Sequence, residues 1–486
     1  MKRTVSLALV LVLALALFGC AGEKNIQVEA DAGTGFRVGY SRVIMTPEEP
    51  LGLGGFGSAD ARIMTDVMDD IYVTCIAITD EWDNTILLMP VDMQRLTDGV
   101  VSNLRMAVSN ASGVPQDQIF ITSSHTHSIP AMEKNDEGYM RFKEMMVERF
   151  YMAAEQAMAD RKPAQVYTGR IEAEGLNFIK HYQYVDENGE TQHFGDNFGT
   201  ATYNKTTQHV KEPYDDMLLL QFKREGGKDI VVCNWRAHPT LTGGVSELNL
   251  SSDYIGPLRE AVELELDCHF GFIQGACGNI NPRSRLDEEN FGTEKNYREY
   301  GARLAEVCVE GIQNNMEKRT PGLVQSRIWR IELEVDHSQD NLLTYAKLVR
   351  DMWAQTGNSS SETSAYARQF GIASSYHATA IVVKSGMGQT QDIELGAFSI
   401  GDDMGFFVAP GELFDDFSVE MEARSPFEIT YTVGYADGDW KYFLSGVCSE
   451  YDSYERHYGR FVAGHDQKMM DSWTEVLNAL YENVGE

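Results

Sequence analysis

Apolar runs of strand length alternate along this chain with segments that have the apolar spacing of amphipathic helices. The runs are Ile71–Thr79, Thr85–Val91, Gln118–Thr122, Met217–Phe222, Ile230–Trp235, Phe270–Ile273, Ser326–Val335 and Phe406–Val408. Apolar residues three and four positions apart mark the helical segments Tyr139–Ala159, Gly256–Glu265, Glu294–Ile312 and Asp466–Tyr481. This alternation predicts an α/β fold of layered, mixed β-sheets with flanking helices.

Charge and composition narrow the possible partners. The chain has 41 Lys and Arg residues against 73 Asp and Glu residues, a net charge of −32. Binding to nucleic acid depends on cationic side chains that displace counterions from phosphates, so nucleic acid is excluded as a main partner.

The hydrophobic content of 43% predicts a folded body. No break in composition divides that body, so we expect one domain over residues 37–486, with an exposed loop at Ala354–Ser364.

The N-terminal residues have the pattern of an export signal. A basic start precedes Val5–Phe18, an almost unbroken run of Leu, Val and Ala that is too short to span a bilayer. The run ends at Gly19-Cys20, which resembles the bacterial lipobox, where signal cleavage leaves an N-terminal cysteine that receives lipid. We therefore expect a lipoprotein signal peptide at 1–19, a flexible tether at 20–36, and a bacterial lipoprotein at the cell surface or in the periplasm. The alternative is an ordinary signal peptide followed by an unrelated cysteine.

The chain contains seven cysteines, so six remain besides Cys20. An even number in an exported protein permits disulfides, but no two of these residues form a close CxxC pair. Most lie in apolar stretches such as Val231-Val232-Cys233, which favours buried free thiols.

Three strand-to-turn junctions carry residues of the kinds that bind metals. The run Gln118–Thr122 leads into His125-Thr126-His127, and the two-residue repeat of a strand would put both imidazoles on one side of the backbone. His238 and Glu412 follow two other apolar runs, and Glu412 is expected to open a helical segment. Because α/β folds keep their sites at strand ends, imidazoles and a carboxylate here suit Zn²⁺. Taken singly, His238 could equally be a core or loop residue, and Glu412 a carboxylate favoured by a helix N-terminus.

A glycine-rich turn follows the apolar run at Phe270–Ile273. Its sequence is Gly275-Ala276-Cys277-Gly278-Asn279-Ile280-Asn281-Pro282. The glycines allow close backbone approach, but the turn has neither the GxGxxG nor the Walker pattern, so a nucleotide site is not indicated.

Several motifs, in the same chain order, resemble the catalytic region of neutral and alkaline ceramidases. The likeness extends from about Val38 to Phe461, and its most specific elements contain His125-Thr126-His127-Ser128-Ile129-Pro130 and Pro410-Gly411-Glu412. The other matching elements are Gly39-Tyr40-Ser41-Arg42, Thr46-Pro47, Gly54-Gly55-Phe56-Gly57, Ala237-His238-Pro239-Thr240, Gln274 with Gly278-Asn279-Ile280-Asn281-Pro282, and Glu450-Tyr451 with Tyr454-Glu455. The resemblance implies a fold like the ceramidase catalytic domain.

The resemblance also implies a zinc-dependent amidohydrolase that cleaves an N-acyl bond with metal-activated water. The family's metal ligands fall on His125, His238, Glu412 and Tyr451. The second histidine of its HxH motif, a proton-transfer group beside the metal, falls on His127.

Two positions depart from the family pattern. Asn281 stands where the family has its catalytic serine, and an amide cannot be a comparable nucleophile, so we expect Asn281 to donate a hydrogen bond to the substrate carbonyl or oxyanion. Lys180 replaces an arginine of the substrate-binding element and lacks the planar fork of a guanidinium. We therefore expect polar recognition to differ from that in the family, with ceramide or another amide as substrate.

Two functions from different classes follow. The first is an enzyme that hydrolyses a small-molecule or lipid N-acyl substrate and contacts the membrane only through its lipid anchor. The second is a non-catalytic lipoprotein that keeps the fold and binds a ligand or metal. Retention of the apparent ligands and of His127 favours the enzyme, because a binder has no evident need for an open metal position, whereas Asn281 favours the binder. The sequence specifies no oligomeric state.

We predict that Cys20 is the mature N-terminus and carries lipid, because the basic start, the apolar run and the Gly19-Cys20 junction fit signal cleavage before a lipidated cysteine. Mass spectrometry of the N-terminal peptide from membrane fractions checks this. A soluble mature chain that starts at another residue would contradict it.

Overall fold

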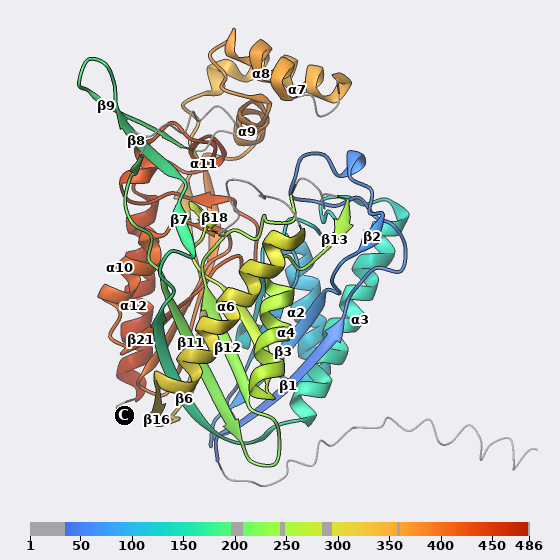
Figure 1. The fold of residues 1–486 in the computed structure, drawn as a ribbon, viewed down its shortest axis with the longest axis vertical. Helices are drawn as coiled ribbons and strands as arrows, with labels where there is room; N and C mark the ends of the chain where they lie inside the picture. Colours follow the sequence, from blue (N-terminus) through green and yellow to red (C-terminus); the bar gives the residue numbers. More distant parts are fainter. Residues whose placement is uncertain (1–34, 196–207, 244–247, 284–293, 357–359, 485–486) are drawn as a thin grey trace, which may run out of the picture. The chain divides into compact units, whose positions relative to one another are not determined.

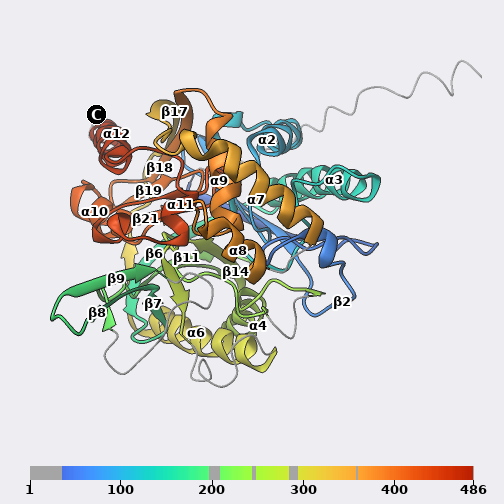
Figure 2. The same cartoon turned by 90° about the horizontal axis from the view of Figure 1, so that it is seen from above.

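Two β-sheets pack face to face, and helices cover the outer face of each (Figures 1 and 2). A computed structural model describes residues 35–195, 208–243, 248–283, 294–356 and 360–484. Within it, Phe36–Glu486 form one compact unit. The predicted signal peptide, Cys20 and almost the whole tether lie outside the described residues. No helix in the described part combines the length and apolar content that a bilayer crossing requires.

The larger sheet has nine strands in the order β14-β12-β11-β6-β1-β3-β4-β5, with β16 beside β6. Its strands are β1 (Arg37–Ile44), β3 (Tyr72–Thr79), β4 (Thr85–Val91), β5 (Ile119–Ser123), β6 (Lys162–Glu172), β11 (Asp216–Arg224), β12 (Ile230–Trp235), β14 (His269–Gln274) and β16 (Met316–Arg319). The pairs β4–β5 and β12–β14 are parallel, and the other pairs are antiparallel. β1 and β6 join the two halves of the sheet through only two residue pairs, Arg37 with Pro163 and Val38 with Lys162.

The smaller sheet has four strands in the order β17-β18-β19-β21. They are β17 (Val324–Glu334), β18 (Thr390–Ile400), β19 (Met404–Val408) and β21 (Ile429–Val433). β17 and β18 form a long antiparallel pair, while β19 and β21 run parallel.

The two-residue repeat of the strands separates two cores on the faces of the larger sheet. In β3, Ile76 and Ile78 face the smaller sheet, where they pack in a cluster with Phe398 and Phe406, whereas Cys75 and Ala77 belong to the cluster beneath the helices. All four β3 residues are fully buried. Strands covered on both faces are apolar at every position, which explains why these segments appear in the sequence as continuous apolar runs.

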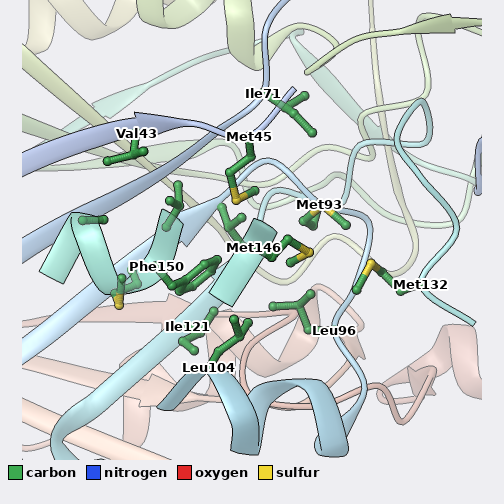
Figure 3. Close-up of a cluster of buried hydrophobic side chains, with 14 of the residues drawn as sticks. Val43, Met45, Ile71, Met93, Leu96, Leu104, Ile121, Met132, Met146 and Phe150 are labelled. Carbon is green, nitrogen blue, oxygen red and sulfur yellow. The ribbon is translucent and has the colours of Figure 1, made fainter. Parts of the chain in front are cut away.

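Three pairs of helices cover the outer faces. They are α2 (Asp98–Ser112) with α3 (Glu137–Ala159), α4 (Ile255–Leu266) with α6 (Glu294–Asn314), and α10 (Asp416–Arg424) with α12 (His465–Val484). Figure 3 shows the cluster beneath α2 and α3, where Phe150 and Met146 of α3 meet Ile121 of β5 and Val43 of β1. The predicted helices α3, α4, α6 and α12 are confirmed to within a few residues.

Shorter elements gather at one end of the molecule, where Figure 1 shows α7–α9 and the β8–β9 hairpin. The helices are α7 (Leu343–Thr356), α8 (Ser360–Arg368), α9 (Ser375–Ser385) and α11 (Tyr454–Tyr458), with 3₁₀ turns at Ala59–Ala61, Asp340–Leu342 and Val447–Glu450. A further 3₁₀ turn, Gln116–Gln118, immediately precedes β5. The strands are β2 (Asp66–Val67), β7 (Asn177–Ile179), β8 (His181–Val185), β9 (Thr191–Gly195), β10 (Gln208–His209), β13 (Asn249–Leu250), β15 (Ile280–Pro282), β20 (Glu412–Leu413) and β22 (Tyr442–Phe443).

The structure confirms the predicted α/β layers and corrects two local expectations. The segment Ala354–Ser364, expected to be an exposed loop, ends α7 and begins α8, and only residues 357–359 within it lie outside the described part. Glu412 does not open a helix, because Glu412 and Leu413 pair with Tyr442 and Phe443 as strands and α10 begins only at Asp416. The six cysteines within the described residues are all buried and unpaired, as predicted.

Candidate metal centre

Strands from both sheets end at one place. His125 follows β5 by two residues, His238 follows β12 by three, and Glu412 follows β19 of the smaller sheet by four. Backbone hydrogen bonds connect these ends: the Gly275 amide donates to Trp235, and the Gly434 amide, just after β21, donates to Gln274 of β14. The site therefore lies where both sheets end, as expected for an α/β fold.

Three imidazoles and one carboxylate converge there. His125 Nε2 lies 3.1 Å from His238 Nε2 and 3.2 Å from His127 Nε2. Glu412 Oε2 lies 3.5 Å from the Nε2 atoms of His125 and His238. His125, His238 and Glu412 are buried, and the three histidines form the one potential metal-binding cluster found within the described residues.

Two backbone carbonyls fix the protonation of His125 and His238. Nδ1 of His125 lies 2.8 Å from the carbonyl oxygen of Gln94, and Nδ1 of His238 lies 2.8 Å from that of Cys277. Because a carbonyl can only accept, each Nδ1 carries a proton, and in the neutral ring Nε2 presents its lone pair to the centre. Burial, together with the charge of Lys180, lowers the pKa of His238 to about 4, so its ring is neutral at pH 7.

This donor set fits a cation. Two Nε2 lone pairs and the Glu412 carboxylate face one another, and Glu412 Oε2 is buried without a hydrogen-bond donor among the described residues. Buried groups of this kind repel one another unless a cation or proton lies between them. Imidazoles oriented by carbonyl groups are the usual arrangement around protein-bound zinc.

His127 stands at the edge of the centre on a glycine loop. Its ring packs against Phe56, with 5.2 Å between centroids, and its main-chain oxygen accepts hydrogen bonds from Arg62. Gly55 has a φ of +104°, and a Cβ at that position would lie 2.4 Å from Cβ of His127. Only glycine lets the loop approach this closely, which gives the Gly54-Gly55-Phe56-Gly57 motif its role.

The two histidines of the HxH motif do not lie on a strand. β5 ends at Ser123, and His125 has the left-handed φ of +67°. The expectation that strand periodicity aligns the two rings is therefore corrected. A turn after the strand brings them together, with the His125 amide bonded to the Met93 carbonyl and the His127 amide to that of Pro239.

The glycine-rich turn joins His238 to Glu412. The Cys277 carbonyl orients the His238 ring, and the Gly278 amide donates to the Leu413 carbonyl at 2.7 Å. A Cβ on Gly278 would lie 2.8 Å from the carbonyl oxygen of Glu412, so a side chain would force the two segments apart. The turn therefore positions His238 relative to Glu412.

Tyr442, and not the expected Tyr451, pairs with Glu412 in this structure. Tyr442 pairs with Glu412 between β20 and β22, and burial and the Glu412 carboxylate raise the pKa of its phenol well above the usual value. Tyr451 instead stacks on His193, with 4.5 Å between ring centroids, and lies against His181. No sequence motif contains Tyr442. Its strand pairing with Glu412 is a contact between residues that are distant in the sequence, so local patterns could not reveal it.

Asn281 and Lys180 lie beside the centre. Asn281 belongs to β15, which pairs with β7, and Lys180 directly follows β7. Asn281 pairs with Phe178, and its neighbour Ile280 accepts a hydrogen bond from the His238 amide. The Lys180 ammonium lies 2.8 Å from the Glu455 carboxylate and 5.9 Å from the Tyr442 ring centroid. Neither residue is among those that line the cavity at the centre.

A cavity of about 450 Å³ opens onto the histidines. Its walls come from the glycine loop, from Gln94 and Arg95, from one face of α9, and from the tyrosines of α11. This volume is in the range of small-molecule sites.

Two solved structures with a similar architecture are described as ceramidases. No protein-family model matches the sequence, and no curated protein matches it. The chain is similar to the crystal structure of neutral ceramidase from Pseudomonas aeruginosa, with a TM-score of 0.70 and 15% identity, over 93% of this chain and 75% of that one. A structure described as ceramidase complexed with C2 has a TM-score of 0.67 and 15% identity, with coverages of 93% and 76%. The predicted ceramidase-like fold is confirmed.

We predict that one Zn²⁺ binds per chain and that His125→Ala and His238→Ala lose it, since each substitution removes a ligand from the buried set. Tyr442→Phe should weaken zinc binding about 10-fold or more, and Tyr451→Phe is the matched control. Metal analysis and competition with a chelator measure this. Zinc retained at one equivalent in both alanine variants contradicts the site, and weaker binding in Tyr451→Phe alone would return the ligand role to Tyr451.

A second prediction concerns the glycine loop. Gly55→Ala should lower the free energy of unfolding by about 2–4 kcal/mol, because left-handed strain adds to a clash with His127. Gly113→Ala is the control, since Gly113 also has a positive φ, +74°, but its Cβ would meet no atom within 4 Å. It should cost only about 1–2 kcal/mol. Denaturant unfolding measures both, and equal losses would contradict the clash.

Proposed function

We propose that this protein is a zinc-dependent amidohydrolase that cleaves an N-acyl bond. The observation that carries the proposal is the pair of imidazoles held by carbonyl groups with Nε2 facing a buried, otherwise unbonded Glu412 oxygen at the floor of a cavity. The ceramidase fold of the chain adds support, because the ceramidases named above share it at the level of architecture.

His125, His238 and Glu412 would hold the zinc, and the phenol of Tyr442, the strand partner of Glu412, would supply a fourth oxygen. Zinc bound there would acidify water to a nucleophile at neutral pH and polarise the amide carbonyl. Gln94 and Cys277 keep the two rings in the required tautomer through their carbonyl groups.

His127 is proposed to carry protons between the nucleophile and the leaving amine. It lines the cavity, and its Nε2 points to the centre 3.2 Å from that of His125. Its Nδ1 is buried without a hydrogen-bond partner among the described residues, so no backbone group fixes its tautomer as the carbonyls fix those of His125 and His238. A ring free to exchange its proton is suited to general acid–base catalysis.

Asn281 is proposed to donate a hydrogen bond to the substrate carbonyl as the oxyanion forms. It is partly exposed, and it follows Ile280, whose carbonyl is bonded to the His238 amide. An amide can donate in this way but cannot form the ester intermediate that a serine forms, so no acyl-enzyme is expected.

The alternative is a protein that binds an amide without cleaving it. The observation in its favour is that Asn281 occupies the position of the expected nucleophile and lies outside the cavity lining. Turnover of a panel of N-acyl compounds, ceramide included, by zinc-loaded and metal-stripped protein decides between the two. Hydrolysis that requires zinc supports the enzyme, and binding without product supports the alternative.

The variants His127→Ala and Asn281→Ala test the two roles. We expect kcat to fall about 10²–10⁴-fold in His127→Ala and about 10²–10³-fold in Asn281→Ala, with zinc retained in both. His337→Ala, a histidine distant in sequence from all of these motifs, is the matched control. Loss of zinc from His127→Ala would make His127 a ligand, and full activity of Asn281→Ala would remove its role.

A further inference from the structure

Cationic side chains outnumber carboxylates in the lining of the cavity above the histidines, although the chain as a whole is acidic. The whole sequence has almost two acidic residues for each basic one, 73 against 41. Two carboxylates line the cavity, Glu133 and Glu412, and Glu412 faces the histidines. Four cationic side chains line it: Arg95, Lys384, Lys441 and Arg460.

One carboxylate, Asp439, is shared by the cations on one wall. Asp439 lies 3.0 Å from Nε of Arg95 and 3.0 Å from Nζ of Lys441. Arg95 has a second, longer contact to Glu133 at 3.6 Å. The single negative charge of Asp439 is therefore shared by two cations, Arg95 and Lys441.

Arg460 has no carboxylate of its own among the described residues. Its Nη1 donates to the main-chain oxygen of Asp439 at 3.5 Å, and its guanidinium lies over the Trp440 ring, 5.6 Å from the centroid. Its backbone is fixed, because the Arg460 carbonyl accepts the amide of Asp336. Arg460 thus presents a positioned, half-buried guanidinium to the cavity with most of its donors uncommitted.

We infer that the cavity binds an amide that carries a carboxylate on its amine side, an N-acyl amino acid, and that Arg460 with Arg95 receives the carboxylate. A guanidinium presents paired N–H donors that match a carboxylate, and partial burial strengthens the interaction. Arg95 connects this anion position to the metal centre, because it directly follows Gln94, whose carbonyl orients His125. The aromatic wall of Tyr376, Tyr454 and Tyr458 would cover apolar parts of the substrate.

This inference rests on the proposed function, and its test separates the two. Isothermal titration calorimetry on the metal-stripped full chain compares N-octanoylglycine, its neutral amide N-octanoylglycinamide, and cationic N-octanoylethylenediamine. We expect the acid to bind about 10- to 100-fold more tightly than the neutral amide, and the cation most weakly. Absence of metal removes direct binding of the carboxylate to zinc as a cause.

Variants assign the preference to Arg460. Arg460→Gln should remove most of the preference for the acid, and Arg460→Lys should keep part of it because the charge remains without the planar fork. Arg327→Gln makes the same charge change at an exposed position and should leave the preference unchanged.

Equal affinity of the unaltered protein for the acid and the neutral amide would overturn the inference, whether or not the variants fold. An undiminished preference in folded Arg460→Gln would overturn the assignment. Binding of the acid without zinc-dependent cleavage of any amide refutes the proposed function alone. Cleavage of all three compounds at equal affinity refutes the anion site alone.

Discussion

The face-to-face packing of the two sheets is the constraint on which the centre depends. His125 and His238 follow strands of the larger sheet, whereas Glu412 follows a strand of the smaller one. The side chain of Asn234 links the sheets at this end, because its Nδ2 donates to the carbonyls of Ile273 and Thr432. A shift of one sheet would separate the carboxylate from the imidazoles, so the apolar core between the sheets is also what assembles the polar site.

The sequence patterns predicted the positions of the strands and helices well, because these patterns depend on local periodicity and burial. β4 and β12 have the predicted bounds, and His125, His238 and Glu412 meet as expected at the strand ends. The patterns failed where distant contacts decide the conformation. Glu412 forms a strand only because Tyr442 pairs with it, and that pairing also brings Tyr442 beside the centre.

Two other features were beyond sequence reasoning for different physical reasons. The left-handed φ of His125 is a strained conformation that tertiary hydrogen bonds impose, and the enrichment of histidine at positive φ is too small to predict it. The serine-rich segment near Ser360 has weak helix propensity, yet α8 forms because Ala367 packs in a small core with residues of α7 and α9. The cationic side chains of the cavity are dispersed from Arg95 to Arg460, so only the fold reveals that they share a wall.

The helices α7, α8 and α9 enclose this small core of their own, made of Ala346, Val349, Ala367, Ile372, Ala378 and Ile381. They meet α11 through aromatic contacts such as the stacked rings of His377 and His457, 3.9 Å apart. The residues of the candidate metal centre come from other elements, whereas α9 contributes a wall of the cavity. The chain is therefore modular: mutations in these helices can reshape the cavity while leaving the histidines and Glu412 in place, so the choice of ligand can change independently of the centre.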